Sequence, residues 1–131
     1  MSLNGYFQEH IFKPMGIQNI NMFPTKHMKE NLAYMHARSA DGKLNINPNG
    51  HLNRRPLWVE TEEDIKRTFN QGGAGCFAKP AEYCQIIAML LNDGVHPGTG
   101  AKILKKETVD EMFTNQVGFC SSKFDTLADA W

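Results

Sequence analysis

The chain has 131 residues, enough for one ordinary domain and too few for two. Hydrophobic residues make up 41% of the sequence, and 14 basic residues balance 14 acidic ones, so the formal net charge is zero. This composition excludes a disordered polar chain, and the lack of a basic excess argues against nucleic acid as a partner.

The N-terminal part of the chain predicts a helix followed by a hairpin. Apolar residues recur at helical spacing within residues 6–12, and Pro14 predicts that the helix ends there. Within residues 31–46, the pair Asp41-Gly42 separates two short arms of alternating polarity. Such a pair between alternating arms predicts a β-hairpin with a tight turn.

Three further helices are predicted after a loop rich in Asn, Pro and Gly at residues 45–56. Residues 60–69 are charged and predict a short helix, and residues 104–114 predict another. The clearest helix lies over residues 80–91. One apolar face of this helix is formed by Tyr83, Ile86, Ile87, Leu90 and Leu91.

In the 104–114 helix, Val109, Met112 and Phe113 should face inward. Residues 118–131 show no period and predict an irregular tail. The fold class predicted from these elements is mainly α with a small antiparallel hairpin, an α+β arrangement. Residues 1–131 would form a single domain or a fragment of one.

The three cysteines and the lack of long apolar runs indicate the cellular compartment in which the protein works. Cys76, Cys84 and Cys120 are odd in number and show no framework spacing, so we expect reduced thiols in an intracellular protein. No apolar run reaches the roughly 18 residues of a membrane span, and the N-terminus lacks the apolar core of a signal peptide. We therefore predict a cytoplasmic protein with no membrane partner.

A glycine loop precedes the clearest helix, and its letters Gly73 to Ala78 satisfy the G-x-G-x-x-A dinucleotide fingerprint. That fingerprint needs a buried strand directly before the glycines, because the strand directs the loop at the pyrophosphate. Here the preceding residues 61–71 are charged and helix-like. A tight turn in which glycine permits close packing is the better explanation.

The order of four segments resembles the serine β-lactamase-like family, which includes class C β-lactamases, penicillin-binding proteins and esterases and acyltransferases of that fold. "GYFQEHIFKPMGIQNINMF" is similar to the family's helix and Pro-Leu-Gly-Met-like signature, and "LAYMHARSADGKL" to its next hairpin. "GGAGCFAKPAEYCQIIAMLLNDG" resembles its glycine loop and long helix, and "GAKILKKETVDEMFTNQV" the helix that follows. The resemblance covers about residues 5–117 and implies the helical part of the β-lactamase/transpeptidase-like fold.

The residues that this family uses for catalysis are missing from the chain. The family acylates a serine in Ser-x-x-Lys, yet none of the four serines here is followed three positions later by lysine. None of the three tyrosines begins the family's Tyr-x-Asn element. His96-Pro97-Gly98 matches the letters of the third element but lies where the family has an ordinary turn. No catalytic residue is therefore assigned, and the resemblance implies a middle segment of a larger enzyme.

Other kinds of site find little support in the sequence. A Cys–His nucleophile could use Cys76 or Cys84, but no family spacing supports it, and Cys84 is expected to be a small core residue. The scattered histidines and cysteines form no zinc-ligand pattern, so no metal or other cofactor is expected. Glu62, Glu63 and Asp64 are interpreted as a solvated helix face.

Two departures from the family concern the starts of helices. The family usually has Ser or Thr where Ala78 stands and Ser where Lys105 stands. Both helices are therefore predicted to lack a side-chain N-cap, an effect of about 0.5–2 kcal/mol each.

Two functions remain open at this point. The first is a fragment of a β-lactamase-related serine hydrolase or acyltransferase, inactive alone, whose parent acts on a small ester, thioester or amide. The resemblance places Gly73, Ala74 and Gly75 at the edge of the parent's substrate cleft. The second is a free-standing, non-catalytic protein-interaction module. Because apolar helix faces would lack their partners in a fragment, we expect the isolated chain to form a homo-oligomer.

Overall fold

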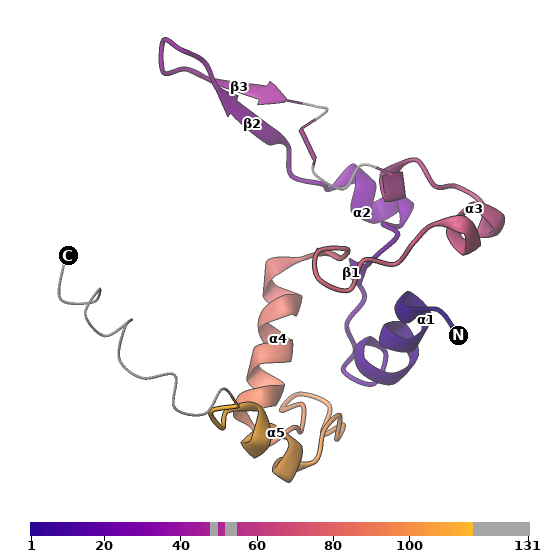
Figure 1. The fold of residues 1–131 in the computed structure, drawn as a ribbon, viewed down its shortest axis with the longest axis vertical. Helices are drawn as coiled ribbons and strands as arrows, with labels where there is room; N and C mark the ends of the chain where they lie inside the picture. Colours follow the sequence, from indigo (N-terminus) through magenta and orange to yellow (C-terminus); the bar gives the residue numbers. More distant parts are fainter. Residues whose placement is uncertain (48–49, 52–54, 117–131) are drawn as a thin grey trace.

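The computed structural model describes residues 1–47, 50–51 and 55–116. The predicted irregular tail, residues 118–131, lies outside these described residues. Within them the chain forms five α-helices and two small antiparallel sheets, which confirms the α+β class (Figure 1). The predicted order of helix, hairpin and three further helices is also found.

The N-terminal helix forms where the apolar spacing predicted it. Helix α1 (Leu3–Phe7) starts with Ser2, whose Oγ accepts a hydrogen bond from the Gly5 N–H at 3.1 Å, and continues as the π-helical turn η1 (Gln8–Phe12). The chain then reverses at Gly16, which has a φ of +73°. Only glycine adopts this left-handed conformation without strain, so the Pro-x-Gly sequence ends the helix.

Two elements after this turn were not predicted. Strand β1 (Ile20–Asn21) pairs antiparallel with β4 (Phe77–Ala78), with Ile20 opposite Ala78. Helix α2 (Lys26–Glu30) begins at Thr25, whose Oγ1 accepts the Met28 N–H at 3.2 Å. Both elements are short, and they position the segment that leads into the hairpin.

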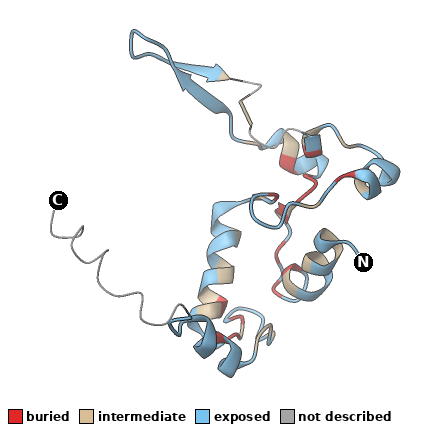
Figure 2. Cartoon of the chain, in the orientation of Figure 1, coloured by how far each residue is buried: buried red, intermediate tan, exposed pale blue. Residues whose placement is uncertain are grey.

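The predicted hairpin is confirmed and projects from the rest of the molecule (Figure 1). Strands β2 (Met35–Arg38) and β3 (Leu44–Asn47) pair antiparallel, and Gly42 in the turn has a φ of +84°. Every residue of β2 is exposed, as Figure 2 shows. A two-stranded hairpin with both faces in water is marginally stable alone.

Of the remaining three α-helices, two are shorter than predicted, and the third has the predicted bounds of residues 80–91. The 3₁₀ turn η2 (Arg55–Leu57) precedes α3 (Glu62–Arg67). Helices α4 (Pro80–Leu91) and α5 (Lys106–Met112) follow, and neither has a side-chain N-cap, as predicted. The capping residue of α4 is Lys79, however, not the predicted Ala78, because Pro80 occupies the first helical position.

The core cluster lies between the N-terminal segment and α4. Its buried members are Phe12, Met15, Ile17, Ile20 and Met89, and the half-buried side chains packed against it are Phe7, Ile11, Ile86, Leu90, Ile103 and Leu104. Figure 2 shows buried segments between α1 and β1 and near the end of α4. The helix, the Pro-x-Gly turn and α4 therefore stabilise one another.

The predicted apolar face of α4 is only partly buried. Ile86 and Leu90 contact the core cluster beside Met89, whereas Tyr83, Ile87 and Leu91 are 55%, 46% and 78% exposed. In α5, Val109 is buried as predicted, but the prediction that Met112 and Phe113 face inward is wrong, since both are exposed. The short α5 buries a single side chain, which leaves its last turn uncovered.

The longest helix of the described residues, α4, has 12 residues. A membrane-spanning helix needs about 20 apolar residues. None of the helices in this part of the chain is long and apolar enough to cross a membrane.

Candidate functional site

The glycine loop forms a turn between α3 and β4, with no strand before it. The Asn70 side chain fixes its start, because Oδ1 accepts the Asn4 N–H at 3.0 Å. Gly75 is buried, and a Cβ at this position would lie 2.3 Å from the Gln71 carbonyl oxygen. Close backbone packing therefore explains this glycine, as the sequence analysis expected.

The other residues assigned to a cleft edge lie on the surface of the same turn. Gly73 and Ala74 are exposed, and a Cβ at Gly73 would meet no atom within 4 Å. The structure thus brings Gly73, Ala74 and Gly75 together in one loop, and only the last needs to be glycine for steric reasons. Phe77, two residues after Gly75, lines a pocket.

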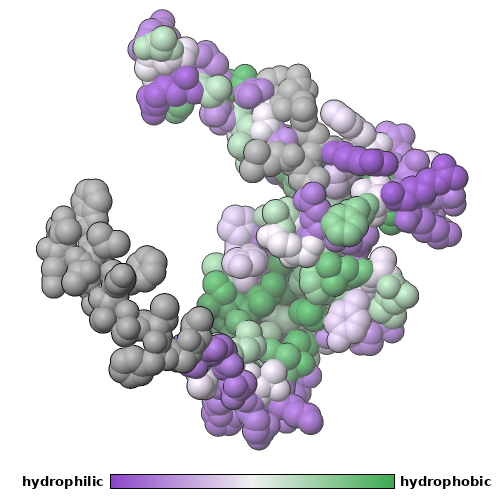
Figure 3. Space-filling view, in the orientation of Figure 1, coloured by the Kyte–Doolittle hydropathy of each residue, from purple (hydrophilic) through white to green (hydrophobic). Residues whose placement is uncertain are grey.

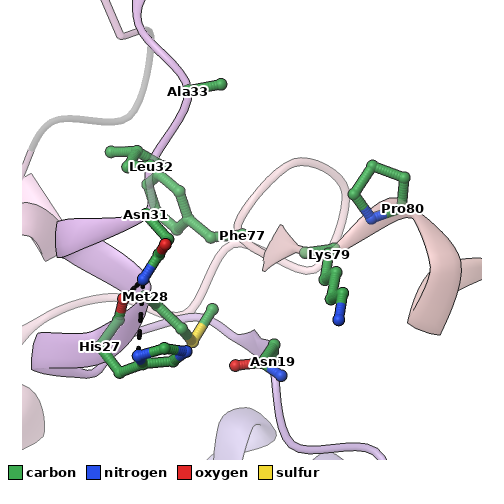
Figure 4. A pocket seen from close by; sticks show the side chains of 10 residues that line it. Asn19, His27, Met28, Asn31, Leu32, Ala33, Phe77, Lys79 and Pro80 are labelled. Carbon is green, nitrogen blue, oxygen red and sulfur yellow. Dashed lines mark hydrogen bonds between the residues drawn. The ribbon is translucent and has the colours of Figure 1, made fainter.

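This pocket was not predicted from the sequence. It has a volume of about 460 Å³, within the roughly 300–1,000 Å³ typical of small-molecule sites. Figure 4 shows the Phe77 ring pointing from β4 toward Leu32, with Met28 of α2 nearby. The ten lining residues are Asn19, His27, Met28, Asn31, Leu32, Ala33, Phe77, Ala78, Lys79 and Pro80.

Polar groups at the pocket are held by local hydrogen bonds. The Asn31 amide nitrogen donates to the His27 carbonyl at 2.9 Å and lies 3.5 Å from His27 Nδ1. Among the described residues the Lys79 ammonium group has no hydrogen bond or ion pair, although its charge acts on the carboxylate of Glu82, so it is available to a ligand.

A carboxylate anchors the wall that carries Lys79. Glu82, in the first turn of α4, accepts hydrogen bonds from the Gln18 N–H at 3.0 Å and the Asn19 N–H at 2.6 Å. Its other oxygen accepts from the Asn19 side-chain amide at 2.7 Å. Burial alone would raise the pKa of Glu82, but these hydrogen bonds and the nearby Lys79 charge lower it overall.

The His96-Pro97-Gly98 sequence forms a structural turn. His96 is buried, and its Nδ1 accepts the Thr99 N–H at 3.1 Å. Thr99 Oγ1 in turn donates to the Pro14 carbonyl at 3.0 Å and so joins this turn to the N-terminal segment. These bonds agree with the interpretation of this sequence as an ordinary turn.

Other candidate residues do not form a site. The expectation that Cys84 is a core residue is wrong, because both Cys84 and Cys76 are exposed. Glu63 pairs with Arg67 at 3.0 Å on an exposed helix face, as predicted for this acidic run. Among the described residues no cluster of three or more His, Cys, Asp or Glu side chains could hold a metal ion.

A sequence signal for the pocket wall existed but was weak. Thr25 followed by a short charged stretch is typical of a helix start. Met28 could then have been placed on that helix, whereas Leu32 lies just beyond its end. The opposite wall depends on the β1–β4 pairing between distant segments, which no local pattern indicates.

Two solved structures of simvastatin synthase (LovD) from Aspergillus terreus are similar to the chain. The LovD6 mutant is 29% identical with a TM-score of 0.64, and the match covers 89% of this chain and 26% of that one. The unliganded selenomethionyl derivative is 26% identical with a TM-score of 0.65, over 98% and 27% of the two chains. No protein-family model matches the sequence, and no curated protein was found to match it.

The chain thus spans about a quarter of the length of these structures. They have the β-lactamase-like serine hydrolase fold, so the resemblance inferred from the four segments is confirmed.

Proposed function

We propose that the chain is one part of a β-lactamase-related serine hydrolase or acyltransferase whose nucleophile lies outside these 131 residues. The observation that carries this proposal is the unequal coverage of the matches. LovD aligns with up to 98% of this chain, whereas the chain accounts for only 26–27% of LovD. The lack of Ser-x-x-Lys in the sequence supports the same conclusion.

The parent enzyme would act on a small ester, thioester or amide. A serine would attack the carbonyl, form an acyl-enzyme and release the acyl group to water or to another acceptor. In this proposal Gly73, Ala74 and Gly75 lie at the edge of the substrate cleft. The exposure of Gly73 and Ala74, and the pocket that begins at Phe77, support that placement. The chemistry needs no metal or organic cofactor.

Exposed apolar side chains support the view that more protein covers this chain. In Figure 3, hydrophobic side chains gather over α4 and toward the N-terminal segment. Fully burying one such side chain contributes about 1.5–3 kcal/mol, so leaving several in water is unfavourable. The exposed members on α4, and on or directly after α5, are Tyr83, Ile87, Leu91, Met112 and Phe113. In the isolated chain, a second copy would cover them and give a homo-oligomer.

A protein-interaction module is the second candidate, and the projecting hairpin favours it. Tyr34, Leu44 and Ile46 are exposed at 65%, 61% and 58% on or beside the hairpin. A partner protein could pair with its strand edges and cover these side chains. This module would bind through the hairpin and would need no nucleophile.

Labelling with a fluorescent phosphonate directed at active serines tests the enzyme proposal. The protein encoded by the whole reading frame that contains residues 1–131 should be labelled. The labelled residue should be the serine of a Ser-x-x-Lys sequence outside residues 1–131. Purified residues 1–131 should remain unlabelled and show neither burst nor turnover with a chromogenic ester or a β-lactam. Stoichiometric labelling of Ser39, or a reading frame without Ser-x-x-Lys, would contradict the proposal.

A further inference from the structure

The pocket between α2 and β4 combines apolar walls with a cationic rim. Met28, Leu32, Phe77 and Pro80 line it, and Figure 4 shows the Phe77 ring beside Leu32, with Pro80 beyond Lys79. None of the ten lining residues is an aspartate or glutamate. We propose that this pocket binds a small amphipathic carboxylate, with its apolar chain against Leu32 and Phe77 and its carboxylate at Lys79.

The charge distribution favours an anion over a neutral or cationic ligand. The Lys79 ammonium group has no hydrogen-bonded partner among the described residues. Glu82 interacts electrostatically with Lys79, but its carboxylate already accepts three hydrogen bonds from Gln18 and Asn19 and does not line the pocket. A ligand carboxylate at Lys79 therefore gains a charge-assisted hydrogen bond without displacing an existing ion pair.

The apolar walls of the pocket favour a ligand with a hydrocarbon chain. The pocket of about 460 Å³ exceeds the space of a simple inorganic anion and accommodates a chain of several methylene groups. Each buried methylene should strengthen binding about threefold to fourfold until the pocket is filled. This inference does not rest on the proposed acyl transfer, because both pocket walls belong to this chain.

A chain-length and charge series tests the proposal directly. ¹⁵N-labelled residues 1–131 are titrated with hexanoate, octanoate, octan-1-ol and octyltrimethylammonium, below the concentrations at which they aggregate, and followed by NMR. Octanoate should shift the amides of Met28, Leu32 and Phe77 saturably and bind more tightly than hexanoate. Octan-1-ol should bind about tenfold more weakly, because it lacks the charge-assisted hydrogen bond.

Two matched lysine variants identify the group that recognises the carboxylate. Lys79 and Lys105 both occupy N-cap positions without a side-chain cap bond, and both are exposed. Lys79→Met should weaken octanoate binding to the level of octan-1-ol, whereas Lys105→Met should leave it unchanged. Equal binding of octanoate by both variants, equal binding of octan-1-ol and octanoate, or shifts centred on Ile87 and Leu91 would each overturn the proposal.

Discussion

Both oxygens of the Glu82 carboxylate accept hydrogen bonds from Asn19, one from its backbone N–H at 2.6 Å and one from its side-chain amide at 2.7 Å. The Lys79 N–H also donates to the Asn19 carbonyl at 2.9 Å. Residues sixty or more positions apart are thus held in register where α4 begins beside β1. This junction fixes the wall of the pocket that carries Lys79.

The first prediction concerns the stability of this junction. Glu82→Gln should lower the free energy of unfolding by about 1 kcal/mol. Several fully buried charge-assisted hydrogen bonds would contribute more, but the Glu82 carboxylate is partly exposed to water, which weakens them. Urea denaturation measures the change. Glu107→Gln is the matched control, since Glu107 lies in the first turn of α5, and it should cost no more than about 0.5 kcal/mol. Equal losses in both variants would show that the Asn19 bonds contribute nothing.

The pH dependence of stability follows from the same carboxylate. The hydrogen bonds lower the pKa of Glu82 below its ordinary value of 4.5, so the folded state favours the ionised form. Its contribution is therefore complete above pH 4.5 and is lost as the pH falls through the lower pKa of the folded state. Wild type and Glu82→Gln should differ most near neutral pH, and their unfolding free energies should converge in acid. A pH-independent difference would contradict this assignment.

The glycine loop gives a paired prediction. Gly75→Ala should destabilise the fold by more than about 1 kcal/mol, because the new Cβ would lie 2.3 Å from the Gln71 carbonyl oxygen and force the backbone to move. Gly73→Ala has open space and a φ that is not positive, so it should leave stability unchanged or raise it by about 0.4–1 kcal/mol. Thermal melts of the two variants distinguish a packed turn from a loop that merely tolerates glycine.

Substitutions at two adjacent residues of α4 distinguish an effect on self-association from an effect on folding. Ile87 is 46% exposed, whereas Ile86 packs against the core cluster. Ile87→Glu should convert an oligomer to a monomer in light scattering, with cooperative unfolding retained. Ile86→Glu should reduce stability by more than about 2 kcal/mol, because it places a charge against the core. If the unmutated chain is already a stable monomer at high concentration, the predicted oligomer does not form.

A nucleotide should not bind at the glycine loop, because helix α3 precedes it where a dinucleotide site needs a strand. Millimolar NAD, FAD or ATP should therefore leave the melting temperature unchanged. A ligand present at 100 times its dissociation constant would add about 2.7 kcal/mol, which a melt would detect. A clear upward shift would revive the dinucleotide interpretation.

Local signals in the sequence predicted the elements that local geometry determines. Asp41-Gly42 fixed the hairpin turn, and Pro14 with Gly16 marked the end of the first helix. The β1–β4 pairing could not be predicted, because two-residue strands show no alternation and their partners are distant. The periodicity of α4 indicated an apolar face but could not say which part is covered. Ile86 and Leu90 contact the core cluster, whereas Ile87 and Leu91 on the same face are exposed.

The candidate site was predicted less completely than the fold. The glycine loop was recognised as a turn, but its place at a cleft edge still rests on the resemblance. The pocket beside it was missed, since Leu32 and Phe77 come from segments that only the tertiary fold brings together. Cys84 was misplaced because its type favours burial, whereas its position on α4 turns it to solvent.

The pairing of β1 with β4 brings together the two ends of residues 22–76. This segment can therefore be regarded as a long insertion between the two parts of the chain that form the core cluster. All members of the core cluster come from residues 7–20 and 86–104. Loop-closure entropy rises by only about 0.6 kcal/mol for each doubling of loop length, so the segment can change length at little thermodynamic cost. One wall of the pocket, including Met28 and Leu32, belongs to that segment, whereas Phe77 and Lys79 adjoin the core. Ligand selectivity can therefore change through Leu32 and the exposed parts of this segment, whereas the buried Met22, Phe23 and Met28 also help to keep the protein folded.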